Sequence, residues 1–215
     1  MKRLFTLLLA AFSVFAAQAQ QNDPNAKKIL DAVSAKFKSF KAPKASFSYK
    51  IENSSGKVLS TKKGTLAMKG VKYHISMPGM EIFSDGKQNW NYDKSANEVT
   101  VKDVENATGE ITPQKLFTNF YDKDFLYKLN GETKKDGKTL EEIELTPTNK
   151  TRPYHKVYLW IDKATKVFHS ASILEKSGNR YTYTVSSFKA DGGTGDSEFT
   201  FNKAKYPGVE VVDLR

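Results

Sequence analysis

Histidine is the side chain of this sequence best suited to acid–base or metal chemistry near neutral pH, and the chain contains three of them. His74, His155 and His169 lie far apart, each within a run of alternating polar and apolar residues. None forms the H-x-x-x-H spacing with which one helix face binds zinc. We interpret all three as structural residues of strands and predict no metal site, although sequence alone leaves open whether folding brings them together.

No other pattern in the sequence predicts an enzyme. The G-x-S-x-G elbow is absent, and the lack of cysteine excludes thiol nucleophiles, disulfides, thiolate zinc sites and lipid attachment through an N-terminal cysteine. Glu141, Glu142 and Glu144 cluster on a predicted strand, where we expect them to be solvated. The glycine-rich stretch 192–195 lacks the Lys-Ser/Thr pair of a phosphate-binding loop and is interpreted as a mobile connection. We predict no catalytic residue and no cofactor.

A helix is predicted from Pro24 onward. Asp23 is a favoured N-cap residue, proline is favoured at the first helical position, and Pro43 ends the segment. Apolar residues recur at helical spacing at Ile29, Leu30, Val33 and Phe37, with Phe40 at the end. An amphipathic helix therefore precedes the first strand.

From residue 45 onward the apolar period changes to two, which is typical of strands with one buried face. Turn signals separate about a dozen strands, the last expected at residues 198–201, and a short helix with an aromatic face is predicted over residues 112–120. No strand–helix–strand alternation is present, which excludes a doubly wound sheet. We predict one mainly β domain over residues 20–215, an incomplete (open) antiparallel β-barrel of about eleven to twelve strands with helices covering its concave face.

Aromatic, methionine and aliphatic side chains recur on one side of several adjoining predicted strands. They are Phe47, Tyr49, Leu66, Met68, Tyr73, Ile75, Met77, Trp90 and Tyr92. Their periodicity is compatible with two interpretations, an ordinary hydrophobic core or the lining of a cavity. Methionine and aromatic residues suit a cavity that accepts varied apolar ligands, because methionine is flexible and polarisable.

The N-terminus has the pattern of a secretory signal peptide. Lys2 and Arg3 precede an apolar run over residues 4–17, and Ala17-Gln18-Ala19 offers small residues at the cleavage positions. We expect cleavage after Ala19 and export of residues 20–215. The formal net charge is +10, yet the lysines are spread along the chain. Nucleic acid is not an expected partner of an exported protein, and a general attraction to anionic membrane surfaces follows instead.

Two stretches resemble signatures of the outer-membrane lipoprotein carrier (LolA) family. The first is Ser-Asp-Gly-Lys at residues 84–87 followed by Trp-Asn-Tyr-Asp at residues 90–93, and the second is Tyr-Pro-Gly-Val-Glu-Val at residues 206–211. Gly64-Thr65-Leu66 is similar to the family's G-x-L strand, and the predicted helix at residue 112 is similar to the start of its mid-chain helix. The resemblance covers essentially the whole exported chain.

This resemblance implies an apolar cavity that holds lipoprotein acyl chains, lined by the nine residues above and covered by a lid containing Leu116, Phe117 and Phe120. It also implies a periplasmic carrier with two protein partners, an inner-membrane ABC transporter complex and an outer-membrane acceptor, and a carrier that hands cargo between two membranes would suit a monomer. One departure is Gly70, which stands where family members carry an arginine that holds the lid shut; Lys69 and Lys72 are its neighbours in sequence. The alternative is a divergent periplasmic lipid-binding or envelope-stress-sensing protein on the same fold.

Overall fold

The computed structural model describes residues 22–104 and 121–215. The described chain forms α1 (Pro24–Lys38), α3 (Tyr121–Asp124), two 3-10 helices and twelve strands. The 3-10 helices are η2 (Asp196–Phe199) and η3 (Lys203–Lys205). The strands are β1 (Lys44–Glu52), β2 (Val58–Lys69), β3 (Lys72–Met77), β4 (Met80–Ser84), β5 (Gln88–Asp93), β6 (Glu98–Asp103), β7 (Phe125–Lys135), β8 (Lys138–Pro147), β9 (Tyr154–Asp162), β10 (Phe168–Glu175), β11 (Arg180–Lys189) and β12 (Glu210–Asp213).

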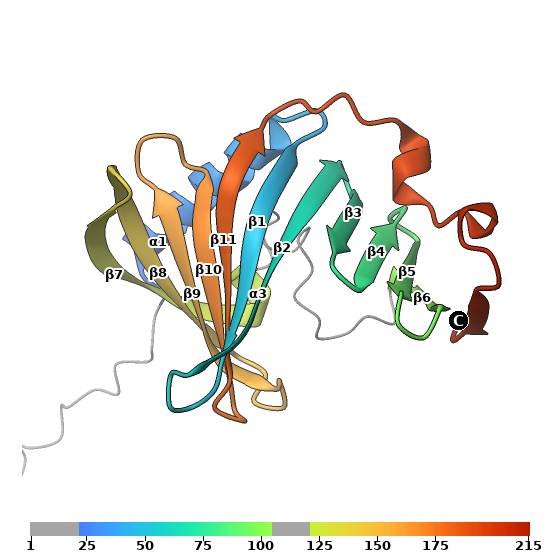
Figure 1. Ribbon diagram of the computed structural model, residues 1–215. Helices are drawn as coiled ribbons and strands as arrows, with labels where there is room; N and C mark the ends of the chain where they lie inside the picture. The colour runs from blue at the N-terminus through green and yellow to red at the C-terminus, as the bar shows by residue number, and fades with distance from the viewer. Residues whose placement is uncertain (1–21, 105–120) are drawn as a thin grey trace, which may run out of the picture.

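All twelve strands belong to one curved sheet in the order β12-β6-β5-β4-β3-β2-β1-β11-β10-β9-β8-β7. Every pairing is antiparallel except that of β12 with β6. Because β7 and β12 are the edges and do not pair with each other, the sheet curves without closing (Figure 1). The predicted fold class, an open and mainly β barrel, is confirmed.

Helix α1 begins where the sequence predicts it. The Asp23 carboxylate accepts a hydrogen bond from the Asn25 N–H at 2.8 Å and one from the Leu129 N–H of β7 at 3.0 Å. The Leu129 hydrogen bond is the main cause that lowers the pKa of Asp23 below its ordinary value. One side chain therefore both caps α1 and fixes it to the sheet.

The buried face of α1 packs on the β7–β10 part of the sheet (Figure 1). This core contains Ile29, Leu30 and Val33 from the helix together with Ile143, Leu145, Val157, Leu159 and Ile161 from the strands. A second, smaller core lies under β5 and β6, where Tyr92, Val99 and Val209 are buried. None of the helices in the described ranges has both the length and the apolar character needed to span a bilayer.

The C-terminal segment differs from its prediction. The strand expected at residues 198–201 is wrong, because the chain forms η2 there and buries Phe199 completely. Asp196 binds Lys69 at 2.8 Å and Lys72 at 3.3 Å, and Glu198 binds Lys44 at 3.4 Å. These ion pairs hold the segment across the ends of β1–β3, and the chain then returns to the sheet as β12.

Candidate functional site

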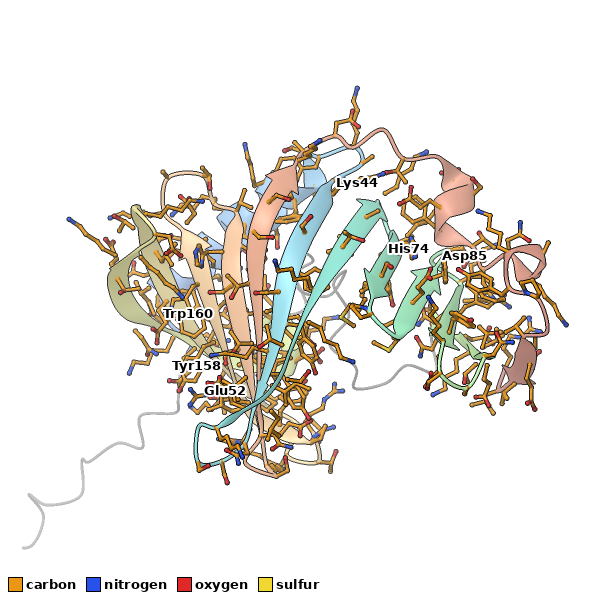
Figure 2. The ribbon with its side chains drawn as sticks, in the orientation of Figure 1. Lys44, Glu52, His74, Asp85, Tyr158 and Trp160 are labelled. Carbon is orange, nitrogen blue, oxygen red and sulfur yellow. The ribbon has the colours of Figure 1, made fainter. Side chains whose placement is uncertain are left out.

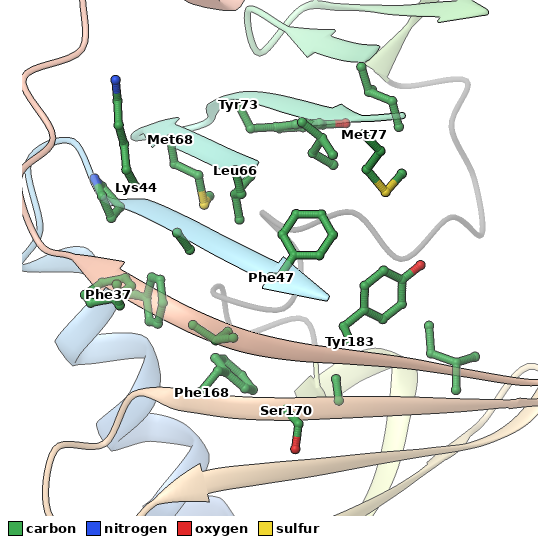
Figure 3. A pocket seen from close by; sticks show the side chains of 18 of the residues that line it. Phe37, Lys44, Phe47, Leu66, Met68, Tyr73, Met77, Phe168, Ser170 and Tyr183 are labelled. Carbon is green, nitrogen blue, oxygen red and sulfur yellow. The ribbon is translucent and has the colours of Figure 1, made fainter. Parts of the chain in front are cut away.

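An apolar cavity of about 270 Å³ lies inside the curve of the sheet. Its volume is just below the roughly 300–1,000 Å³ that is typical of small-molecule sites. Figure 3 shows Met68 and Met77 on one side of the cavity and Phe168 and Tyr183 on the other, with Phe47 between them. Strands β1–β4 and β9–β11 supply most of the lining, and the end of α1 adds Phe37.

Glycine at position 64 allows one wall of this cavity to form. A Cβ atom there would lie 2.7 Å from Phe47 Cζ and 2.7 Å from Met77 Cγ, closer than real contacts allow. The missing side chain lets the aromatic ring and the thioether approach across β2. The glycine of the G-x-L pattern therefore shapes the cavity wall.

A few polar groups interrupt the apolar lining. Asn89, Asn91 and Lys102 extend from β5 and β6, and Lys44 and Ser170 lie among the lining residues of β1 and β10. The Tyr73 hydroxyl donates a hydrogen bond to Asn89 Oδ1 at 3.3 Å, so this tyrosine presents its ring to the cavity. The rest of the wall offers dispersion contacts and no reactive group, which suits a hydrocarbon ligand.

Six of the nine residues predicted to line a cavity are brought together around this space. They are Phe47, Leu66, Met68, Tyr73, Ile75 and Met77. The structure brings them together because Leu66, Ile75 and Ile82 are directly opposite one another on β2, β3 and β4.

Tyr49 is not among the lining residues. It lies on the same face of β1 as Phe47, one alternation further along, and stacks on Tyr183 with ring centroids 4.8 Å apart. Burial raises the pKa of Tyr183 to about 12 and also raises that of Tyr49. Both phenols are therefore neutral at physiological pH and extend the apolar wall as an aromatic stack.

Trp90 and Tyr92 lie on the opposite face of the sheet from the cavity. Ile82 of β4 lines the cavity and is paired with Asn91, so on β5 the odd-numbered residues face inward. Tyr92 instead contacts the Tyr206 ring, at 4.5 Å between centroids, and Trp90 packs against the same small core. Trp90 and Tyr92 therefore pack against the C-terminal segment, whereas Asn89 and Asn91 of the same strand lie on the cavity face.

Met80 and Ile82 of β4 and the lining residues outside β1–β4 were not predicted from the sequence. Phe37, Phe168, Ile173, Tyr183, Val185 and Phe188 come from α1, β10 and β11. Alternation in these strands was visible in the sequence. What the sequence did not show is that β11 pairs with β1, which places Val185 opposite Phe47.

Gly70 lies in the turn between β2 and β3 with a φ of +58°, and a Cβ there would meet nothing within 4 Å. Its two lysine neighbours, Lys69 and Lys72, both bind Asp196 of η2. In this structure these lysines hold the C-terminal segment. Leu116, Phe117 and Phe120, which were predicted to form a lid, lie outside the described residues.

The three histidines stay apart in the fold. His74, labelled in Figure 2, stacks on Phe83 with ring centroids 4.2 Å apart and contacts Glu81 at 3.3 Å. His169 is buried and its Nε2 lies 3.2 Å from Asp136, whereas His155 is exposed. Within residues 22–104 and 121–215 no three His, Asp or Glu side chains converge as metal ligands would.

The glutamate cluster on β8 is only partly as expected. Glu141 is buried, with 6% of its surface exposed, and pairs with Lys166 at 2.5 Å, so the expectation that it is solvated is wrong. Glu142 accepts a hydrogen bond at 3.0 Å from the indole of Trp160, the residue labelled in Figure 2. Glu144 pairs with Lys156, whose ammonium is the main cause of its lowered pKa. The three carboxylates are held by partners on neighbouring elements.

Residues 38–202 match the family model described as outer membrane lipoprotein carrier protein LolA. The outer-membrane lipoprotein carrier protein of Serratia proteamaculans (strain 568) is 29% identical over 178 residues, with 80% of this chain and 81% of that protein covered. The protein of the same description from Yersinia pestis is 29% identical over 175 residues, with the same coverage.

Solved structures show the same fold at low sequence identity. An uncharacterized conserved protein from Thermus thermophilus superposes with a TM-score of 0.61 and 13% identity, covering 88% of this chain and 99% of its own. A domain assigned to outer membrane lipoprotein sorting from Vibrio parahaemolyticus gives a TM-score of 0.50 and 14% identity, covering 85% and 98%. These similarities concern the fold alone.

Proposed function

The chain belongs to the outer membrane lipoprotein carrier family, and from that premise we propose that it is a periplasmic lipoprotein carrier. It shields the acyl chains of a lipoprotein in the cavity and transfers the lipoprotein from the inner to the outer membrane. The observation that carries this proposal is the cavity of about 270 Å³ with a predominantly apolar lining. The six predicted residues on its wall, from Phe47 to Met77, are proposed to contact the acyl chains.

The physical need for such a cavity follows from the cost of exposing hydrocarbon to water. Each methylene group that leaves an apolar environment costs about 0.8 kcal/mol, so a bare acyl chain does not cross an aqueous compartment alone. Because the sheet curves without closing, an acyl chain can enter its concave side and lie among the side chains that line the cavity. Transport of this kind needs apolar surface and no catalytic residue, and we propose that the protein is not an enzyme.

The N-terminal signal pattern supports a periplasmic location, with cleavage after Ala19 leaving a carrier free to diffuse. We propose that this monomeric carrier receives lipoproteins from an inner-membrane ABC transporter complex and delivers them to an outer-membrane acceptor. Leu116, Phe117 and Phe120 are proposed to form the lid.

Native mass spectrometry of the protein purified from cells tests the cavity and the lid together. The expected result is a bound lipoprotein or acyl lipid on the wild-type protein. The same mass is expected to be missing from the Phe117→Glu variant, because a carboxylate on a lid would have to be desolvated against hydrocarbon. An acyl adduct on both proteins would contradict the lid, and its absence from both would contradict the cavity mechanism.

The departure at Gly70 favours one alternative function. With no arginine there, and with Lys69 and Lys72 bound to Asp196, a lid would have to be held by other groups. The alternative is a divergent lipid-binding or envelope-stress-sensing protein on the same fold. Co-purification of free lipid without any lipoprotein in the same mass spectra would favour this alternative over the carrier.

A further inference from the structure

Three loops meet at one end of the sheet, away from α1 and from the C-terminal segment (Figure 1). They are residues 52–59, 148–153 and 175–180, and we call them the hairpin end. The Lys176 N–H donates a hydrogen bond to the Pro153 carbonyl at 2.8 Å. Close packing joins the other pair of loops, since a Cβ atom at Gly178 would lie 2.8 Å from Ser54 Cβ. The three loops therefore form one continuous surface.

Two consecutive large apolar side chains are exposed on this surface. Val58 is 50% exposed and Leu59 is 56% exposed, at the start of β2. Successive residues of a strand point to opposite faces, so one of such a pair is ordinarily covered by the sheet. At this point β1 pairs Glu52 with Val58 and Ile51 with Ser60, so Leu59 lies at a β-bulge, and β3 pairs only with residues 65–69 of β2. The Asn53 carboxamide holds the preceding turn by accepting hydrogen bonds from the Ser55 and Lys57 N–H groups.

The charge around this apolar pair is predominantly positive. The hairpin end contains five basic residues and two acidic ones; the basic residues are Lys57, Lys150, Arg152, Lys176 and Arg180. Within the described ranges, none of the five forms an ion pair with a carboxylate, whereas Glu52 is paired with Lys50 at 3.0 Å. The hairpin end therefore combines an exposed Val-Leu pair with a formal net charge of +3, from five basic residues less two acidic ones.

We propose that the hairpin end docks on an anionic lipid bilayer, with Val58 and Leu59 entering the headgroup region and the five basic side chains lying over phosphates. Apolar burial and attraction of Lys and Arg to anionic lipids are the two forces that hold peripheral proteins on membranes. The apolar area is a protruding tip of two side chains rather than a groove, which fits the penetrable surface of a bilayer better than a folded partner. The site lies outside the cavity and goes beyond the proposed carrier function.

Co-sedimentation of the purified protein with vesicles tests this proposal. Binding is expected to vesicles that contain phosphatidylglycerol, to be weak on phosphatidylcholine alone, and to fall as salt screens the charges. The double variant Val58→Ser, Leu59→Ser is expected to bind the anionic vesicles about tenfold more weakly, because less apolar surface is buried. Its matched control is Val71→Ser, Leu214→Ser, which removes two side chains of similar exposure elsewhere and is expected to bind as wild type.

A second pair of variants tests the charges. Lys57→Gln with Lys176→Gln is expected to weaken binding and flatten its salt dependence, and Lys87→Gln with Lys134→Gln, exposed lysines outside the hairpin end, is expected to leave both unchanged. Circular dichroism of each variant verifies that the sheet is folded. Equal binding to both kinds of vesicle, or equal loss in the hairpin-end and control variants, would overturn the proposal, whatever the cavity binds.

Discussion

Ile75 lies in the middle of β3, and its side chain lines the cavity between Leu66 of β2 and Ile82 of β4. Replacing it with glutamate places a charge among hydrocarbon groups, where desolvation costs several kcal/mol. We expect Ile75→Glu to lower the affinity for a fluorescent fatty acyl probe by at least about a hundredfold. Fluorescence titration of the purified protein measures this.

Val71→Glu is the matched control, because Val71 is exposed in the turn that precedes the same strand and does not line the cavity. It is expected to bind the probe like the wild type. Equal affinity of the Ile75→Glu variant and the control would show that the acyl chain binds elsewhere.

For individual residues, the sequence predicted which strand positions are apolar, but it did not always predict which face of the sheet they occupy. The stripe from Leu66 to Met77 was predicted because its alternation is unbroken through one hairpin. Trp90 and Tyr92 looked equally apolar, yet the β4–β5 register puts Asn91 on the cavity side. Nothing in β5 itself reveals this, since its polar face is the one that faces the cavity and its apolar face packs under Tyr206.

Among the elements, α1 depends most clearly on a single side chain. Asp23 caps the helix and also binds the Leu129 N–H of β7. We expect Asp23→Ala to lower the free energy of unfolding by about 0.5–2 kcal/mol, the usual cost of a lost N-cap. Urea denaturation at neutral pH followed by circular dichroism measures the loss.

The lowered pKa of Asp23 gives this prediction a pH dependence. The folded state binds the proton less tightly than the unfolded state, so the charged carboxylate stabilises the fold above its ordinary pKa of 3.8. That contribution is lost as the pH falls through the lowered value. The difference in free energy of unfolding between wild type and Asp23→Ala should therefore shrink in acid, and a difference that stays constant or grows would contradict the assignment.

Capping and turn residues correctly predicted those helices and hairpins that are held mainly by contacts between residues close in sequence. The N-cap and Pro24 mark the start of α1, and glycine turns separate the β2–β5 hairpins. The C-terminal segment could not be predicted this way. Residues 198–201 alternate like a strand, but Asp196 and Glu198 bind lysines of β1–β3 and Phe199 fills the space beneath, so contacts distant in sequence decide its conformation.

For the whole molecule, the decisive feature is a twelve-stranded sheet that curves without closing. The antiparallel strands β1–β11 followed from period-two alternation and turn spacing, whereas the strand predicted at residues 198–201 is wrong and the parallel edge strand β12 was not predicted. The pairing of β1 with β11 joins strands more than a hundred residues apart, and it creates the cavity by bringing Val185 opposite Phe47. No local pattern encodes that pairing, so it was not predicted from the sequence.

The most direct test of the carrier proposal compares the binding of one lipoprotein with and without its acyl chains. Isothermal titration in detergent below its critical micelle concentration measures both affinities. Because each buried methylene contributes about 0.8 kcal/mol, the lipidated form is predicted to bind at least about a hundredfold more tightly than the delipidated form. Equal affinity for the two forms would contradict the claim that the apolar cavity holds the acyl chains.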